Sequence, residues 1–257
     1  MELGLANQQF IVSGASSGLG KAIAIALAKE QAKVIAVARG ITALKELQDQ
    51  YPEQITIIEA DITQIETIDI IKQIIGNSII HGIVVNAGGP PAKTALETTL
   101  QDWDDAYKNI LRWKVALTQA FITKMTKAAY GRIIFIESSS IKQPLENLVL
   151  STSLRLAVVG FVKTLSQEVA ANGITLNVLA PGSHNTPAIN RIYQKKSEQT
   201  GLLETIIREK AIEQIPVKRL GEADDFASLA LWLLSKYSGY VTGQTISVDG
   251  GAVKGTF

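Results

Sequence analysis

Ser13-Gly14-Ala15-Ser16-Ser17-Gly18-Leu19-Gly20 is the stretch of this sequence that decides its fold. It follows an apolar run at 10–12 that predicts a β-strand, and it opens an apolar-periodic run at 21–30 that predicts a helix. Backbone N–H groups point outward at the start of such a helix, and the helix dipole favours negative charge there. The first glycine permits the tight turn, the second lets a pyrophosphate approach the backbone, and the third lets the helix pack close to the strand. Three glycines alone are also typical of a structural turn, but the strand before and the helix after favour an anion-binding loop.

The composition is that of a folded, globular chain. The 257 residues are 46% hydrophobic and 19% charged, which supplies a sizeable core and argues against disorder. The net charge of +1 gives no electrostatic case for nucleic acid or an acidic membrane as a partner. Without cysteine the chain has no disulfide framework and no thiol catalysis, and we expect no metal site. The sequence shows no cationic, apolar leader and no apolar run of membrane-spanning length, so we expect a soluble, cytoplasmic protein.

Strand and helix patterns alternate along the whole chain. Apolar runs predict strands at 10–12, 33–38, 55–60, 79–85, 132–136, 174–179 and 245–248, and helical patterns predict helices at 21–30, 41–50, 64–75, 101–129, 148–171 and 222–235. The strands are continuously apolar, as expected when helices cover both faces of a parallel sheet. We therefore predict one α/β domain over residues 1–257, a Rossmann fold with a doubly wound parallel sheet of about seven strands flanked by helices. The more polar segment 187–215 is predicted to be a mobile helical flap over the substrate.

In sheets of this kind, ligands bind beyond the carboxyl ends of the strands. The residues that follow each predicted strand are therefore the candidate binding residues. They are Gly14, Ser16, Ser17, Gly18, Leu19 and Gly20 after the first strand, then Arg39, Asp61, Ile62, Asn86, Ala87, Gly88, Pro181, Gly182, His184 and Thr186. The fifth strand adds the hydroxyl trio Ser138-Ser139-Ser140, which is either a catalytic element or a polar strand end with locally bonded hydroxyls.

Arg39 bears on the choice of cofactor. A carboxylate after the second strand would bind an adenosine ribose 2′-OH and repel a 2′-phosphate, whereas Arg39 can pair with that phosphate. The residue therefore favours NADP(H), with NAD(H) still possible; the alternative is a solvated surface arginine. Asp61 has two interpretations as well, as an acceptor for the adenine amino group or as a helix cap before Thr63.

The motifs together resemble those of the short-chain dehydrogenase/reductase family, and most of all its 3-oxoacyl-acyl-carrier-protein reductase-like members. The resemblance runs through nearly the whole chain in the family's order, in the glycine stretch, Asn86-Ala87-Gly88, Pro181-Gly182 with Thr186, and Tyr240-Val241-Thr242-Gly243-Gln244 followed by Asp249-Gly250-Gly251. It implies an NAD(P)-dependent oxidoreductase that moves a hydride between the cofactor and a carbonyl or alcohol. The implied substrate is a small molecule or an acyl-carrier- or CoA-linked carbonyl such as a 3-oxoacyl thioester, and the implied assembly is a homodimer or homotetramer.

The resemblance also implies where the cofactor lies. The backbone of Gly14 to Leu19 would hold the pyrophosphate, Asn86 and Ala87 would lie along the adenosine ribose, and Pro181 to Thr186 would hold the nicotinamide.

The sequence departs from the family at the catalytic positions. The family uses an Asn, a Ser, and a Tyr with a Lys four residues later; the Tyr is the general acid/base and the Lys holds the nicotinamide ribose. Ser138 matches the Ser, whereas Ser151 stands at the Tyr position and Arg155 at the Lys position. Arg155 is therefore a candidate cofactor-binding residue as well, because it can hold ribose hydroxyls and supply positive charge. Ile110 falls at the Asn position, with Asn109 one residue early, which on a helix is a rotation of roughly 100°. The family's catalytic set is therefore degenerate, with only Ser138 intact.

This departure leaves the proton donor open. A serine hydroxyl is a much poorer acid than a phenol, whose pKa is about 10, and a guanidinium does not give up its proton at neutral pH. Lys142, His184 and Tyr193 are alternative donors, although an ordinary role as a loop or helix-face residue explains each of them better.

Two function classes follow. One is an oxidoreductase with an altered site of Ser138, Ser151 and Arg155. The other is a dinucleotide-binding sensor or scaffold without turnover. A weaker third is a structural partner in a mixed oligomer.

Overall fold

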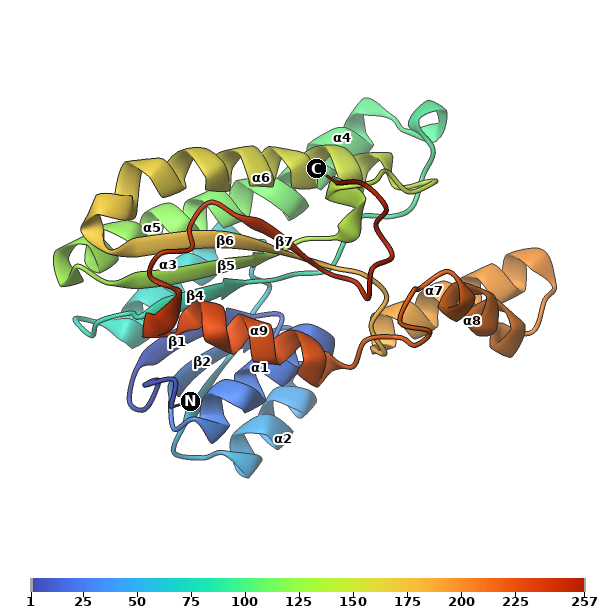
Figure 1. The fold of residues 1–257 in the computed structure, drawn as a ribbon. Helices are drawn as coiled ribbons and strands as arrows, with labels where there is room; N and C mark the ends of the chain where they lie inside the picture. The colour runs from blue at the N-terminus through green and yellow to red at the C-terminus, as the bar shows by residue number, and fades with distance from the viewer. Residues whose placement is uncertain (1, 257) are drawn as a thin grey trace.

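The computed structural model describes residues 2–256 as one parallel sheet with helices on both faces (Figure 1). Its strands are β1 (Gln9–Ser13), β2 (Lys33–Ala38), β3 (Ile55–Glu59), β4 (Gly82–Val85), β5 (Gly131–Ile136), β6 (Ile174–Pro181) and β7 (Thr245–Val248). They are all parallel and lie in the order β3-β2-β1-β4-β5-β6-β7. The strand order reverses direction between β1 and β4, so the predicted doubly wound Rossmann sheet of seven strands is confirmed.

Two helical layers bury the two faces of the sheet. One layer consists of α1 (Gly18–Lys29), α2 (Ile41–Gln50) and α9 (Ala223–Leu234), and the other of α3 (Ile65–Ile75), α5 (Trp113–Ala128) and α6 (Val149–Val169) (Figure 1). Phe10 and Val12 of β1 belong to the first core, while Ile11 between them belongs to the second. Because successive strand residues face opposite cores, the strands need apolar residues at every position, as the sequence shows.

The helix predicted at 101–129 is interrupted by a π-helical turn. It consists of α4 (Leu100–Ala106), the π-helical residues Tyr107–Arg112 and α5. A π turn accommodates one residue more than an α turn, so it changes which side chains face the sheet. Strand β4 is shorter than the predicted 79–85. Ile79 is exposed, and His81, just before the strand, accepts a hydrogen bond from the Gln9 backbone through Nδ1 at 3.0 Å.

The segment predicted as a flap forms two helices that project from the main body. They are α7 (Pro187–Thr200) and α8 (Glu204–Glu213), at the right of the view (Figure 1). Their buried residues Tyr193 and Ile207 pack with Ile215 and Leu220 in a small core of their own. The helical content of the segment agrees with the prediction, whereas its mobility stays a prediction.

The apolar character of α6 has a structural explanation. Within residues 2–256, the stretch Val149–Asn172 is the one helical segment that by length and composition alone would suit a membrane span. Its Val158 and Val162 are buried in the second core. Packing on the sheet therefore accounts for the buried residues of this helix, whereas Leu156 on its outer side is 45% exposed.

Gly20 sets how closely α1 lies against β1. A Cβ placed on Gly20 would collide with the Gly14 carbonyl oxygen and lie 2.8 Å from Asn86 Nδ2. We expect Gly20→Ala to reduce the free energy of unfolding by about 1–3 kcal/mol, because α1 must move away from the strand. Urea unfolding measures this change. Gly160→Ala is the matched control, because Gly160 lies exposed in α6 with open space around it; there alanine should be neutral or stabilising by up to about 1 kcal/mol. Equal effects of the two substitutions would contradict this account.

Candidate active site

The carboxyl ends of the strands open into a cleft of about 1030 Å³. It brings together nearly all the residues selected from the sequence. Its lining includes Gly14, Ser16, Ser17, Gly18, Leu19, Arg39, Asp61, Ile62, Asn86, Ala87, Gly88, Ser138, Ser151, Arg155, Pro181, Gly182, His184 and Thr186. Gly20, Lys142 and Tyr193 are not among the lining residues: Gly20 packs behind the loop, and Tyr193 is buried in the core of the flap.

The glycine turn presents an open helix end to the cleft. Gly14 (φ +64°) and Gly18 (φ +53°) both adopt the left-handed backbone conformation that residues with a Cβ rarely take. Ser17 at the start of α1 makes no side-chain capping bond, and the first turn of α1 has no acidic residue. The N–H groups of this turn are therefore not used by a side-chain cap, and the local dipole is not neutralised. This arrangement fits the pyrophosphate of a nicotinamide dinucleotide.

Arg39 and Asp61 lie together at the neighbouring end of the cleft. The Arg39 side chain is 80% exposed, and its Nη1 is 3.7 Å from Asp61 Oδ2. Asp61 Oδ1 accepts hydrogen bonds from Thr63 N at 3.0 Å and Thr63 Oγ1 at 2.8 Å. Asp61 thus closes a local turn with Thr63, and it is not the cap of α3, whose N-cap residue is Gln64. A contact with adenine stays a prediction.

Ser138 and Ser151 face the cleft from β5 and α6. Ser138 caps the short turn after β5, and its Oγ accepts a hydrogen bond from Ser140 N at 3.1 Å. Ser151 Oγ accepts one from Arg155 Nε at 3.1 Å. In both cases the protein occupies an acceptor position of the hydroxyl, which leaves its O–H available to donate to a group in the cleft.

A buried cluster of charges stands behind the serines. The Glu137 carboxylate has no exposed surface and accepts from Lys114 Nζ through Oε1 and from Arg155 Nη1 through Oε2, the latter at 2.8 Å. Lys114 is 2% exposed and Arg155 8%. Burial lowers the pKa of Lys114 to about 8; Glu137 opposes this shift and the Arg155 charge adds to it. Two cationic side chains thus bind one carboxylate. We call this cluster of Lys114, Glu137 and Arg155 the charge triad.

Sequence analysis missed Glu137 and Lys114. A signal was present, because Glu137 directly follows a continuously apolar strand and Lys114 lies within an apolar stretch of helix. A charged residue at such a position is buried and must be paired. The partners are 23 residues apart and come from different elements, which is why no spacing rule connects them.

The π-helical turn decides which residue stands near the family's Asn position. Ile110 is 1% exposed and packs inside, whereas Asn109 lines the cleft. The Asn109 carbonyl oxygen accepts a hydrogen bond from Trp113 Nε1 at 2.9 Å. The cleft-lining residue of this turn is therefore Asn109, one residue before Ile110, which the resemblance puts at the family's Asn position.

The three alternative proton donors are poorly placed. His184 is 5% exposed; its Nδ1 lies 3.1 Å from the Gly182 carbonyl oxygen, and its ring packs edge-on against Phe226. The Lys142 backbone N–H bonds to Ser139 O, and Lys142 is not among the lining residues of the cleft. Burial raises the pKa of Tyr193 inside the flap.

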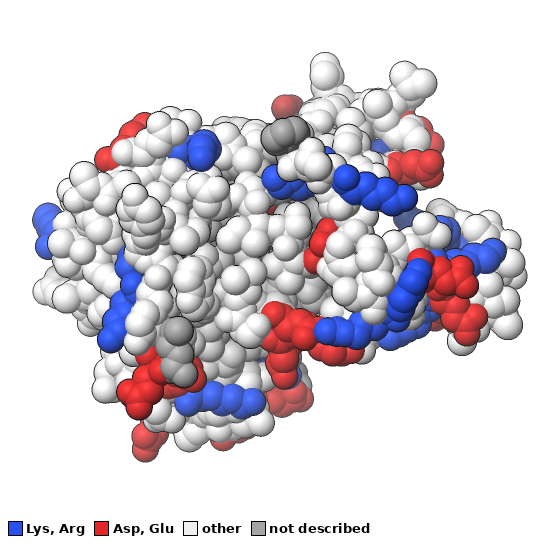
Figure 2. Space-filling model, viewed as in Figure 1, with Lys and Arg blue, Asp and Glu red and all other residues white. Residues whose placement is uncertain are grey.

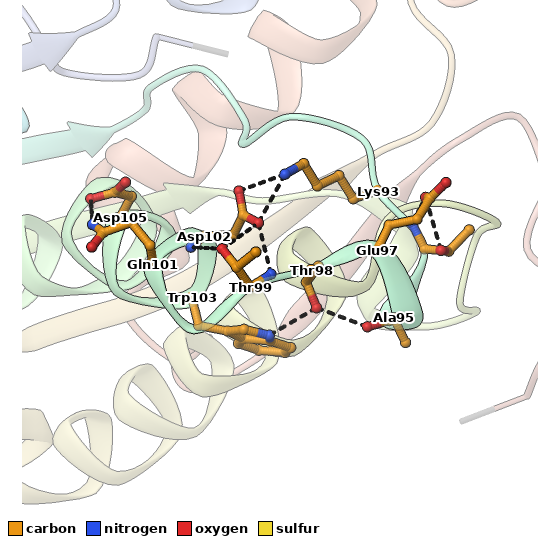
Figure 3. A network of polar contacts seen from close by, with 10 residues as sticks. Lys93, Ala95, Glu97, Thr98, Thr99, Gln101, Asp102, Trp103 and Asp105 are labelled. Atoms are coloured by element: carbon orange, nitrogen blue, oxygen red, sulfur yellow. Dashed lines mark hydrogen bonds and ion pairs between the residues drawn. The ribbon is translucent and has the colours of Figure 1, made fainter.

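A network of hydrogen bonds and an ion pair lies at the rim of the cleft, before and along α4 (Figure 3). Two consecutive capping boxes, Thr94 with Glu97 and Thr99 with Asp102, fix this segment. Lys93 Nζ lies 2.8 Å from both Asp102 oxygens, and the bonds from Lys93 and Thr99 lower the pKa of Asp102 to about 2. Asp102 lines the cleft, but as a carboxylate already engaged by the rim it is not a proton donor at neutral pH.

Comparisons with known proteins agree with this geometry. The family profile described as Enoyl-(Acyl carrier protein) reductase matches residues 14–253. The chain belongs to the short-chain dehydrogenase/reductase family. It is 30% identical to the 3-oxoacyl-[acyl-carrier-protein] reductase FabG of Aquifex aeolicus over 98% of this chain and 99% of that protein. It is 32% identical to dehydrogenase/reductase SDR family member 6 of Xenopus laevis, over 94% of this chain and 95% of that protein.

Solved structures of the family include the L-sorbose reductase of Gluconobacter frateurii in complex with NADPH and L-sorbose. It superposes with a TM-score of 0.92 at 26% identity, covering 99% of this chain and all of that one. As a short-chain dehydrogenase/reductase the protein is an NAD(P)-dependent oxidoreductase, and the resemblance noted in the sequence to FabG-like members is confirmed.

Lys114 should make stability depend on pH. Between pH 8 and its ordinary pKa of 10.5, Lys114 is protonated in the unfolded chain but largely neutral in the folded one. The unfolded state then binds more protons, so stability rises with pH in that window, by at most about 1.4 kcal/mol per pH unit. We expect the difference in unfolding free energy between wild type and Lys114→Met to be flat from pH 6 to 7.5. It should then grow in favour of the wild type from pH 8 to 10. Lys127→Met controls for the loss of an exposed lysine from α5. A flat difference across the whole range would contradict the expectation.

Proposed function

We propose that the protein is an NADP(H)-dependent carbonyl reductase or alcohol dehydrogenase whose site uses Ser138, Ser151 and Arg155 without a catalytic tyrosine. The observation that supports it is the continuity of the cleft. One lining runs from the glycine turn through Asn86 to the two serines and Arg155. A cofactor held by the turn would therefore extend toward these side chains, as in other Rossmann enzymes.

The proposed cofactor contacts are divided between the two ends of the cleft. The glycine turn would hold the pyrophosphate, Asn86 and Ala87 the adenosine ribose, and Pro181 to Thr186 the nicotinamide. Arg39 would bind the 2′-phosphate of NADP(H), because its exposed guanidinium faces the cleft beside Asp61. The NADPH in L-sorbose reductase supports this choice of cofactor.

In the proposed chemistry, hydride transfer to the substrate carbonyl proceeds without a tyrosine phenol. NADPH supplies the hydride when bound. The Ser138 and Ser151 hydroxyls each have an O–H available toward the cleft, and they would donate hydrogen bonds to the substrate oxygen. Arg155 would stabilise negative charge that develops on that oxygen, because its charge is fixed and partly shielded from water. The weak acidity of serine leaves the final proton to come from solvent in the open cleft, so we expect slow turnover.

The substrate class is proposed from the relatives and from the flap. The FabG and sorbose reductase matches suggest 3-oxoacyl thioesters first and small hydroxyketones second. Arg191 and Ile192 of α7 line the cleft, so residues 187–215 would act as a mobile substrate flap. We further propose a cytoplasmic homodimer or homotetramer. Positive and negative side chains are interspersed over the face shown in Figure 2, which agrees with small-molecule substrates rather than nucleic acid.

Arg39 provides the test of cofactor preference. Arg39→Ala should weaken NADPH binding about tenfold, because one charge-assisted hydrogen bond to the 2′-phosphate is lost. NADH binding should hardly change, since NADH lacks that phosphate. Fluorescence titration with each cofactor measures both constants. Lys45→Ala removes an exposed positive charge from the neighbouring α2 and serves as the control. An equal loss for NADPH and NADH would contradict the assignment of Arg39.

Turnover tests the function itself. NADPH oxidation should be measurable with at least one substrate from a panel of 3-oxoacyl thioesters and hydroxyketones. Ser138→Ala and Ser151→Ala should each lower kcat/KM about 10- to 100-fold with little change in NADPH affinity, because the lost hydrogen bond acts on the substrate oxygen. Ser153→Ala on the same helix is the control. Tight NADPH binding without turnover on the whole panel would instead favour the alternative of a dinucleotide-binding sensor or scaffold.

A further inference from the structure

The charge triad contains one residue of the proposed site, Arg155, and two charged residues, Glu137 and Lys114, to which the proposed function gives no role. Glu137 follows β5, Lys114 lies in the first turn of α5, and Arg155 lies on α6. Glu137 and Arg155 line the cleft, whereas Lys114 does not. The triad therefore joins β5, α5 and α6 behind the cleft, and within it the Arg155 side chain is 8% exposed whereas the Glu137 side chain has no exposed surface.

Two of the three nitrogens of the Arg155 guanidinium, Nε and Nη1, donate hydrogen bonds to the protein. Nε donates to Ser151 Oγ at 3.1 Å, and Nη1 donates to Glu137 Oε2 at 2.8 Å and to the Ile136 carbonyl oxygen at 3.4 Å. Nη2 makes no hydrogen bond to any described residue and points toward Gly89, where an added Cβ would be 3.5 Å away. Gly89 and Arg155 both line the cleft. The free edge of the guanidinium is thus the one turned toward a ligand.

Glu137 is the only charged acceptor among these partners, so it has the largest influence on where the guanidinium lies. A carboxylate–guanidinium bond is stronger and more directional than a bond to a neutral acceptor. Lys114 binds the other carboxylate oxygen and restricts the rotation of the Glu137 side chain. Each member of the triad therefore restricts the next.

We propose that Glu137 is a positioning residue of the active site: it holds the Arg155 guanidinium with Nη2 facing the cofactor-binding cleft, and Lys114 holds Glu137 in turn. The proposal rests on the proposed function and adds to it that Arg155, which stands where the family's lysine holds the nicotinamide ribose, contacts the nicotinamide half of the cofactor. It explains how an arginine can serve where the family has a lysine. A lysine has one nitrogen, which can turn to its ligand, whereas a planar fork must be fixed before one edge can meet a ligand.

A double-mutant cycle between Glu137 and Arg155 tests the proposal, with NADPH affinity from fluorescence titration as the readout. Glu137→Gln should weaken NADPH binding about tenfold, and Arg155→Met at least as much. If Glu137 acts through Arg155, the double variant should bind no more weakly than Arg155→Met alone. The proposal would be overturned if the double variant lost NADPH affinity by the product of the two single losses. It would also be overturned if Glu137→Gln bound NADPH as tightly as the wild type.

The simpler possibility is that Glu137 only neutralises the buried Lys114. The variant Lys114→Met with Glu137→Met separates the two roles, because it removes both charges and replaces them with side chains of similar volume. It also serves if Glu137→Gln does not fold. We expect it to be thermally stable yet still to bind NADPH about tenfold more weakly than the wild type. Wild-type affinity in this variant would overturn the positioning role.

Arg132→Lys is the matched control. Arg132 is a buried arginine at the start of β5, the strand that Glu137 follows. It donates hydrogen bonds to the backbone carbonyl oxygens of Gly173 and Ser235, away from the cleft. Its substitution should lower the melting temperature without changing NADPH affinity. A wild-type protein that binds no NADPH would refute the proposed function. Wild-type binding that Glu137→Gln leaves unchanged would refute only the role of Glu137.

Discussion

The parallel direction of all the strands in the described chain is the constraint on which the site depends. Parallel strands end at the same edge of the sheet, so each connection from strand to helix begins there. Residues from positions 14 to 186 thus meet in one cleft although they are distant in the sequence. The constraint comes from the continuously apolar strands, which require a helical layer on each face and so exclude the short hairpins of antiparallel sheets.

Most of the fold could be predicted because its signals are local. Apolar runs and glycine or proline boundaries define the strands, and residues that follow a strand must lie at its carboxyl end. The π-helical turn could not be predicted in this way, because an extra residue in a helical turn leaves the apolar pattern almost unchanged. It is nevertheless what places Asn109 on the cleft and Ile110 inside. The direction of the His184 ring could not be predicted from the sequence either, since it depends on packing against Phe226, 42 residues further along the chain.

The charge triad shows a different limit. Pairing between Glu137, Lys114 and Arg155 depends on how α5 and α6 cross behind β5, which is decided only when the tertiary structure forms. Sequence reasoning identified Arg155 from its place in a motif and treated it as an isolated substitution. The structure shows it as one member of a cluster. An arginine at this position, a glutamate before Ser138 and a lysine in the neighbouring helix therefore form one physical unit.

The π-helical turn separates two stretches of helix with different roles, one at the cleft and one in the core. Upstream, α4 supplies Asp102 and Asp105 to the rim of the cleft; downstream, α5 supplies Trp113, Leu117 and Phe121 to the core. In a continuous α-helix, the angular position of one set would dictate that of the other. The additional residue breaks this phase relationship, so each half keeps its own rotation about the shared axis. The ligand-facing half can thus vary in sequence independently of the half that supports the sheet.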